Sequence, residues 1–137
     1  MALLSSEEIE ALIHRSAFNH FLGIKVESLD AEHLTLKLPF KEEFLRGNEK
    51  IGFSIHGGIL ASLIDITGDF VFATVDGRPL PTINLRVDYL RPAPAADVYA
   101  EAVVVKRGKT ISVSDITVYR PDHKKVAIGR GLYHGLR

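Results

Sequence analysis

One long apolar segment in the middle of the chain most constrains how the chain can fold. No Lys or Arg occurs between Lys50 and Arg78, and this segment predicts a helix from about Ile55 to Val75, terminated by Asp-Gly-Arg-Pro at 76–79. At about 100° per residue, the large apolar side chains fall on one broad arc: Ile59, Leu60, Leu63, Ile64, Ile66, Phe70 and Val71. An arc of this width packs against a sheet, which the remaining chain must supply.

The segments on either side of this helix have the alternating pattern of half-buried strands. Two strands are predicted before it, at 24–29 and 33–39, and four after it, at 83–89, 98–105, 111–119 and 125–133. Short turns separate the last three, which predicts an antiparallel meander. Six strands and one central helix predict an α+β domain in which a six-stranded antiparallel sheet wraps round the helix.

Two further segments complete the expected order of elements. Residues 5–21 predict one short N-terminal helix, with Ser5 or Ser6 as its cap. Residues 41–51 are polar and are predicted to form a loop between the second strand and the long helix.

Composition excludes several classes of protein. The 137 residues fit a single domain at 1–137, and their 17 basic and 17 acidic side chains balance, which disfavours a nucleic-acid partner. The chain has no cysteine, so disulfides and thiolate chemistry are excluded. The N-terminus lacks the basic start and apolar run of a signal peptide, and no apolar stretch is expected to reach membrane-spanning length. These features predict a cytoplasmic protein without a membrane partner.

Opposite the apolar arc, the predicted helix carries small and acidic residues: Gly58, Ser62, Asp65 and Asp69, flanked by Ala61 and Gly68. One reading is that the two acids simply face water. However, a solvated helix face usually mixes Lys, Glu, Gln and Arg, and two carboxylates at i,i+4 repel each other by roughly a few tenths of a kcal/mol. Proximity and partial burial also raise carboxyl pKa values, as in many functional acids. The pattern therefore favours a functional Asp65.

The start of the long helix has a second unusual feature, the sequence His56-Gly57-Gly58. Backbone N–H groups in a first helical turn are unpaired and the helix dipole is positive there, and glycines let a ligand reach those donors. Such an arrangement can stabilise an oxyanion. A flexible helix start capped by His56 is the simpler alternative.

Four segments together resemble a known family, the PaaI-like (phenylacetic-acid-degradation type) hotdog acyl-CoA thioesterases. Residues 56–65 are similar to its HGG-x6-D signature, and residues 85–93 to its strand ending in Y-x-x-P-A. Residues 105–110 resemble its turn before the fifth strand, and 128–131 its closing strand. The resemblance implies a hotdog fold, homodimers often paired into homotetramers, and active sites at the dimer interface.

The resemblance also implies roles for individual residues. Asp65 would be the general base or the nucleophile in hydrolysis of an acyl-CoA thioester. The backbone N–H of Gly57 or Gly58 would polarise the thioester carbonyl, and His56 would help to fix the loop. No metal and no cofactor is implied.

Two supporting roles fall on positions where this chain departs from the family pattern. The family places an Asn six residues before the His, where this chain has Lys50, so Asn48 is the candidate. A Ser or Thr on the first strand after the helix is matched by Thr82, with Asn84 as a competing polar group.

The phosphorylated nucleotide of CoA predicts a basic pocket mouth. By resemblance, the contacts fall on Arg91, Gly108, Lys109 and Thr110. Other basic residues that could contribute are Lys106, Arg107, Arg130 and Arg137. Basic residues at strand ends and turns are also ordinary solubilising charge, which is the simpler reading for any one of them.

Two other functions remain open at this point. A hotdog dehydratase or hydratase would pair a His with an acid, and His56 and Asp65 could serve, although the H-F-P-G motif of such enzymes is absent. A non-catalytic acyl-CoA-binding protein is the other alternative. The absence of G-x-S-x-G disfavours a serine hydrolase.

Overall fold

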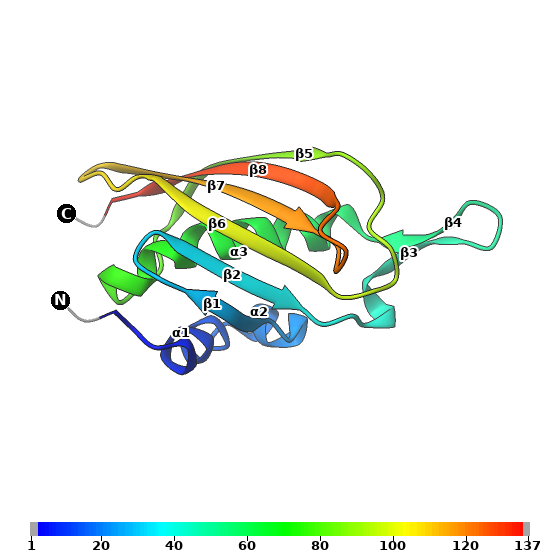
Figure 1. Ribbon diagram of the computed structural model, residues 1–137, viewed down its shortest axis with the longest axis horizontal. Coiled ribbons are helices and arrows are strands. Elements are labelled where there is room, and N and C mark those ends of the chain that lie inside the picture. Colours follow the sequence, from blue (N-terminus) through cyan, green and yellow to red (C-terminus); the bar gives the residue numbers. More distant parts are fainter. Residues whose placement is uncertain (1–2, 136–137) are drawn as a thin grey trace.

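Helix α3 (Gly57–Asp76) lies against one side of a six-stranded antiparallel sheet in the computed structural model, which describes residues 3–135 (Figure 1). The strand order is β1-β2-β6-β7-β8-β5. The bounds are β1 (Lys25–Leu29), β2 (His33–Leu38), β5 (Thr82–Tyr89), β6 (Val98–Lys106), β7 (Ile111–Tyr119) and β8 (Lys125–His134). The predicted central helix, six strands and closing meander are confirmed.

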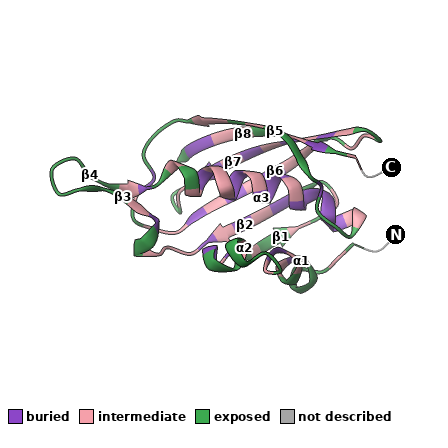
Figure 2. Ribbon diagram, turned by 180° about the vertical axis from the view of Figure 1, so that it is seen from behind, coloured by how far each residue is buried: buried purple, intermediate pink, exposed green. Residues whose placement is uncertain are grey.

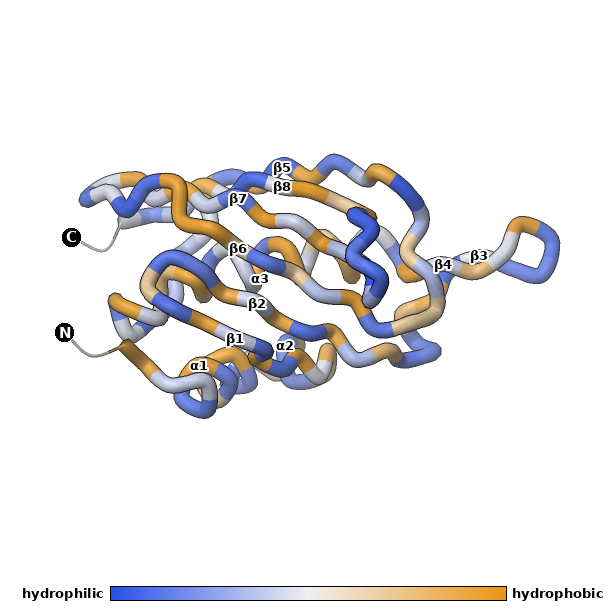
Figure 3. The backbone as a smooth tube through the Cα atoms, viewed as in Figure 1, coloured by the Kyte–Doolittle hydropathy of each residue, from blue (hydrophilic) through white to orange (hydrophobic). Residues whose placement is uncertain are grey.

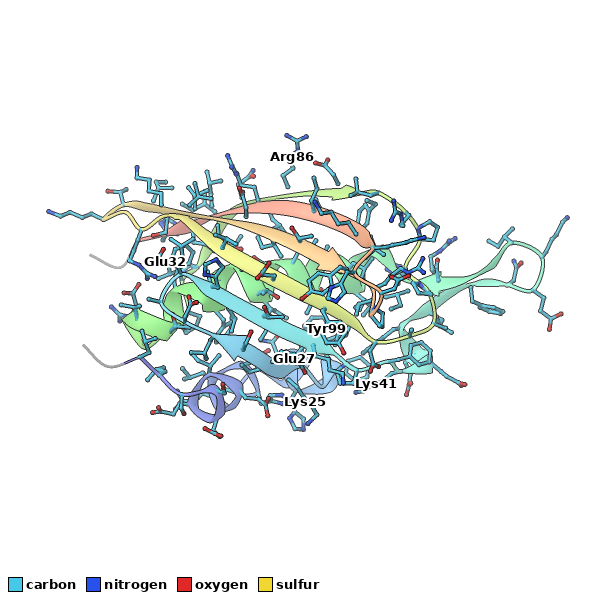
Figure 4. The ribbon with its side chains drawn as sticks, viewed as in Figure 1. Lys25, Glu27, Glu32, Lys41, Arg86 and Tyr99 are labelled. Carbon is cyan, nitrogen blue, oxygen red and sulfur yellow. The ribbon has the colours of Figure 1, made fainter. Side chains whose placement is uncertain are left out.

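The core forms where the apolar arc of α3 meets the sheet. Leu63, Ile64 and Val71 are fully buried, and the strands contribute small and β-branched side chains such as Ala102 and Val118. Hydrophobic and hydrophilic residues alternate along the strands (Figure 3), because successive side chains point to opposite faces. The other face, which carries Glu27 and Tyr99, is turned toward solvent (Figure 4).

Helix α3 is itself long and apolar enough to cross a membrane, so the expectation that no stretch has these properties was wrong. Most of this helix is buried inside the domain, with the sheet covering its apolar arc. The core helix of a sheet-wrapped domain and a membrane span share the same composition, and burial distinguishes them here.

The N-terminal region forms two short helices instead of the single helix predicted. They are α1 (Ser6–Ile13), capped by Ser5, and α2 (Ala17–Leu22), capped by Ser16. The break has two causes. The Ser16 hydroxyl accepts the Asn19 N–H and caps a new helix, and the His14 imidazole reaches the carbonyl of Ile24 at 2.7 Å, a contact that a local pattern does not show.

The segment predicted as a polar loop contains a short 3₁₀ turn and a hairpin. These are η1 (Glu42–Phe44), β3 (Leu45–Asn48) and β4 (Gly52–Ile55). Gly47 and Gly52 have φ of 115° and 83°, which only glycine adopts readily, and they permit the tight reversal. The hairpin extends away from the body of the domain (Figure 1), and Ile51 and Phe53 are more than half exposed on it.

Candidate active site

The first turn of α3 is organised by the His56 side chain. His56 has an extended backbone (φ −56°, ψ 133°), and its Nδ1 accepts the N–H of Gly58 at 2.8 Å. A Cβ on Gly58 would lie 3.0 Å from that nitrogen, so the glycine lets the imidazole lie across the helix end. The predicted capping by His56 is therefore present. Of the two glycine N–H groups, this cap uses that of Gly58 and leaves that of Gly57.

Tyr89, at the end of β5, packs on the same helix end. Its hydroxyl donates to the carbonyl oxygen of Gly57 at 2.7 Å, and a Cβ on Gly57 would lie 3.2 Å from the Tyr89 ring. A surface cavity of about 400 Å³ opens beside this contact, lined among others by Gly57, Leu60, Tyr89 and Arg91. The sequence indicated Tyr89 only as part of a motif, and its contact with Gly57 explains why a tyrosine at that spacing accompanies the glycines.

Asp65 lies two turns further along α3 and is held by a residue of β5. Thr82 Oγ1 donates to Asp65 Oδ1 at 2.8 Å, so the structure brings together two of the predicted site residues. The strand has an irregularity between Thr82 and Asn84, which breaks the alternation that would place both side chains on one face. Of the two candidates, Thr82 is the one that contacts Asp65.

Asp69 lies one turn beyond Asp65 and is more deeply placed. Its Oδ1 accepts the backbone N–H of Leu80 at 3.2 Å. Burial raises the pKa of Asp69 to about 8; the charge of Asp65 adds to this rise and the Leu80 N–H opposes it. The raised carboxyl pKa that the sequence analysis used in favour of Asp65 thus falls on Asp69.

Tyr133 supports the helix beneath Asp65, a role that sequence analysis missed. This fully buried side chain from β8 donates to the carbonyl oxygen of Asp65 at 3.3 Å. A Cβ would lie 2.4 Å from the Tyr133 hydroxyl if it were on Gly68, and 2.2 Å if it were on Gly131. The two glycines therefore form the slot that holds the tyrosine. Gly68 therefore faces the sheet, and the expectation that it flanks the small stripe was wrong. In the sequence, this role could have been recognised from Gly131, a glycine two residues before an aromatic residue on the same predicted strand.

The predicted Asn48 is not brought to Asp65 within this chain. Its side chain lies at the tip of the β3–β4 hairpin, where Oδ1 accepts the N–H groups of Lys50 and Ile51 at 2.9 and 3.0 Å. The amide thus stabilises its own turn, and the hairpin directs it away from the body of the domain (Figure 1).

The predicted CoA contacts divide between the two ends of the sheet. Arg91 follows the end of β5 that pairs with the start of β8, whereas Gly108, Lys109 and Thr110 form the β6–β7 turn beside the end of β8. Gly108 has a local reason to be glycine, because a Cβ there would lie 2.1 Å from the carbonyl oxygen of Ile111. One chain does not bring these residues together.

Several other basic residues are engaged in structural contacts. Arg107 reaches the carbonyl of Ala31 at 2.9 Å and Asp76 at 3.6 Å, and Arg130 pairs with Asp115 through two short contacts. Arg137 lies outside the described residues. Within 3–135, no group of three or more His, Asp or Glu side chains is placed to hold a metal ion.

Comparisons with known proteins point to one family. Residues 54–127 match the family model described as the thioesterase superfamily. The Halobacterium salinarum protein named "Putative esterase VNG_1336C" is 33% identical over all of this chain and 99% of its own length. Escherichia coli "Acyl-coenzyme A thioesterase PaaI" is 31% identical over 93% of this chain and 89% of its own length.

A solved structure shows the same fold. The X-ray structure of a protein described as coming from the thioesterase superfamily superimposes with a TM-score of 0.87 at 36% identity, over 94% of this chain and 96% of the other. The predicted hotdog fold and the resemblance to PaaI are both confirmed. Because the family model matches residues 54–127, more than half of the chain, and the fold agrees with it, the chain belongs to the thioesterase superfamily.

Proposed function

We propose that this protein hydrolyses acyl-CoA thioesters to the free acid and CoA, with Asp65 as the general base or the nucleophile. The observation that carries the proposal is the Asp65–Thr82 contact of 2.8 Å on the small face of α3. A carboxylate fixed by a neighbouring hydroxyl is oriented to take a proton from water or to attack a carbonyl carbon.

Family membership supports thioester hydrolysis in general, and the name of the PaaI relative supports acyl-CoA as the substrate. We propose the cytoplasm as the location, in keeping with a chain that has no cysteine. The helix start supplies the second part of the chemistry, because an N–H such as that of Gly57 can stabilise the oxyanion that forms when the carbonyl is attacked.

The spacing of Gly57 and Asp65 along α3 supports a site shared between two chains. Gly57 and Asp65 are eight residues apart, which is about 12 Å along a helix. A reacting carbonyl must lie about 3 Å from both the attacking group and the oxyanion donor. We therefore propose that Asp65 acts together with Gly57 of the partner subunit.

The exposed edge of the sheet gives such a partner a place to bind. β5 is the last strand of the sheet order, and Ile83 and Tyr89 on it are 42% and 53% exposed. An unpaired edge of this kind favours pairing with another strand. The face of α3 that is turned away from the sheet also lies open in the single chain (Figure 2). We propose a homodimer formed at this edge, with a homotetramer as its extension.

The same arrangement would bring the proposed CoA contacts together. If two β5 strands pair antiparallel, the Arg91 end of one chain lies beside the 108–110 turn of the other. The basic side chains Arg91 and Lys109 would then approach the phosphates of CoA from two subunits.

The proposed activity is tested by measuring thiol release from a panel of short, medium, long and aromatic acyl-CoAs. We expect the wild-type protein to release CoA from at least one class, with the free acid as the product. Products from 3-hydroxyacyl-CoA and enoyl-CoA are analysed in parallel, because water addition or loss without thiol release would indicate a hydratase or dehydratase. Saturable binding without turnover over the whole panel would refute hydrolysis.

The shared site is tested by mixing two inactive variants, Asp65→Asn and Gly57→Val. Random exchange makes half of the dimers mixed, and each mixed dimer has one site in which both residues are intact, so activity should return to about a quarter of wild type. The control is each variant exchanged with itself, which should stay inactive. No recovery after exchange is complete would show that Asp65 and Gly57 act in the same chain.

A further inference from the structure

A second acid of α3 contacts the same connection that carries Thr82. Asp69 Oδ1 accepts the backbone N–H of Leu80 at 3.2 Å, while Asp65 Oδ1 accepts the hydroxyl of Thr82 at 2.8 Å. Two carboxylates one turn apart therefore bind alternate residues of the segment that leads into β5.

The spacing of the two contacts matches on both sides. Four residues of an α-helix rise about 6 Å, and two residues of an extended chain advance about 6.6 Å. Because the two lengths agree, the helix and the extended segment can be joined at both places without distortion of either.

The segment is also held from its other side. Leu80 is only 3% exposed, and the carbonyl of Pro81 accepts the N–H of His134 from β8 at 2.9 Å. Proline also restricts the residue before it to extended conformations. The position of Thr82 is therefore determined by contacts to α3 and β8 that lie immediately before it in the chain.

We infer that Asp69 is a positioning residue for the proposed thioesterase site, in that its contact with Leu80 fixes where Thr82 meets Asp65. The inference rests on the proposed function and gives a reason for a buried acid that the chemistry itself does not use. Asp69 acts through Leu80 and Thr82 and does not touch the reacting atoms.

The protonation of Asp69 adds a second property. The titratable group that acts on its pKa is Asp65 on the same helix, and the adjoining loop contributes the Leu80 N–H. The charge of Asp69 in turn helps to raise the pKa of Tyr133 from β8. With its pKa raised to about 8 by burial, Asp69 is neutral at pH 7 and ionises just above. Ionisation places a second negative charge one turn from Asp65, where it opposes the negative charge that forms in the transition state.

The positioning role is tested with Asp69→Asn and Asp69→Ala, each alone and combined with Thr82→Val. Thr82→Val alone should lower kcat by about tenfold, the worth of one hydrogen bond to a charged group. Asp69→Asn keeps an acceptor for Leu80, so its kcat at pH 7 should stay within about twofold of wild type. Asp69→Ala should lower kcat by about tenfold, and adding Thr82→Val to it should cost less than about twofold more.

The pH profile provides a reading that a purely structural role would not change. For wild type, kcat/KM should fall as the pH rises through about 8, the pKa of Asp69, whereas Asp69→Asn should show no such step. KM at pH 7 should be similar in all variants, because none of the changes removes a proposed CoA contact. Melting curves check folding, and Asp69→Ser, too short to reach Leu80, is the second variant if Asp69→Ala is unstable.

Two results would overturn the inference. In the first, Asp69→Ala keeps wild-type kcat and the full Thr82→Val effect, which would mean that Thr82 needs no help from Asp69. In the second, Asp69→Asn loses as much kcat as Asp69→Ala, which would make the carboxyl group itself essential. Wild-type protein without thioesterase activity would instead refute the proposed function, so the two failures are distinguishable.

Discussion

Replacement of Asp65 by asparagine is expected to lower kcat for acyl-CoA hydrolysis by about 10²–10⁴-fold, the usual contribution of a positioned acid–base group. Asparagine has the same shape and keeps an oxygen that can accept the Thr82 hydroxyl, which lies 2.8 Å from the carboxylate. It cannot take a proton from water and is a poor nucleophile. Steady-state thiol release at saturating substrate measures the effect, and KM should change little because the thioester-binding surface is intact.

The matched control is Asp30→Asn, the same chemical change at an exposed carboxylate that lies 3.1 Å from the His33 imidazole. Asp30 lies in the turn between β1 and β2, and β1 is at the opposite end of the strand order from β5. We expect its kcat within about twofold of wild type, as for an exposed ion pair. Turnover of Asp65→Asn equal to that of the control would remove Asp65 from the mechanism.

A single turnover in H₂¹⁸O separates the two possible roles of Asp65. If Asp65 activates water, the label enters the free acid in the first turnover. If Asp65 attacks the thioester carbon, CoA leaves as the mixed anhydride forms. Water that then attacks the Asp65 carbonyl carbon puts the label on Asp65 and releases the free acid without it.

Replacement of Gly131 by alanine is expected to lower the free energy of unfolding by about 3 kcal/mol, the upper range for overpacking a core. The added Cβ would lie 2.2 Å from the Tyr133 hydroxyl and 2.4 Å from two ring carbons. The ring has little room to move toward α3, because its hydroxyl already fills the space that a Cβ on Gly68 would occupy, 2.4 Å from the position of that Cβ. Denaturant unfolding of both proteins at one concentration measures the change, since self-association affects apparent stability.

The control for this steric mechanism is a double-mutant cycle with Tyr133→Leu. Leucine removes the hydroxyl and the far end of the ring, so Gly131→Ala should cost much less in its presence than in wild type. Equal cost in both backgrounds, or a loss below about 1 kcal/mol in wild type, would show that Tyr133 does not occupy the slot described.

The central architecture was predictable because it depends on side-chain periodicity. The apolar arc of α3 and the alternation in β6, β7 and β8 each repeat over many residues, so the pattern survives local exceptions. Asp65 was indicated by its place among small residues on the opposite stripe, and Thr82 by resemblance to the family. Their contact joins residues 17 apart, which periodicity alone does not show.

What the sequence did not predict depends on tertiary contacts. The break between α1 and α2 involves the contact of His14 with Ile24, and Gly68 faces Tyr133 from a strand more than sixty residues later. Asn48 was assigned to the site by resemblance, whereas in the single chain its amide binds its own turn. The role of Asn48 in the site stays a prediction.

The burial of α3 has a consequence for synthesis of the protein. The ribosome synthesises residues 57–76 before β6, β7 and β8, the strands that cover the apolar arc of this helix. Until the chain has emerged as far as β8, a nascent helix with the composition of a membrane span remains uncovered. The domain must therefore complete folding after nearly all of it has been translated, and premature termination between α3 and β8 would release an aggregation-prone fragment.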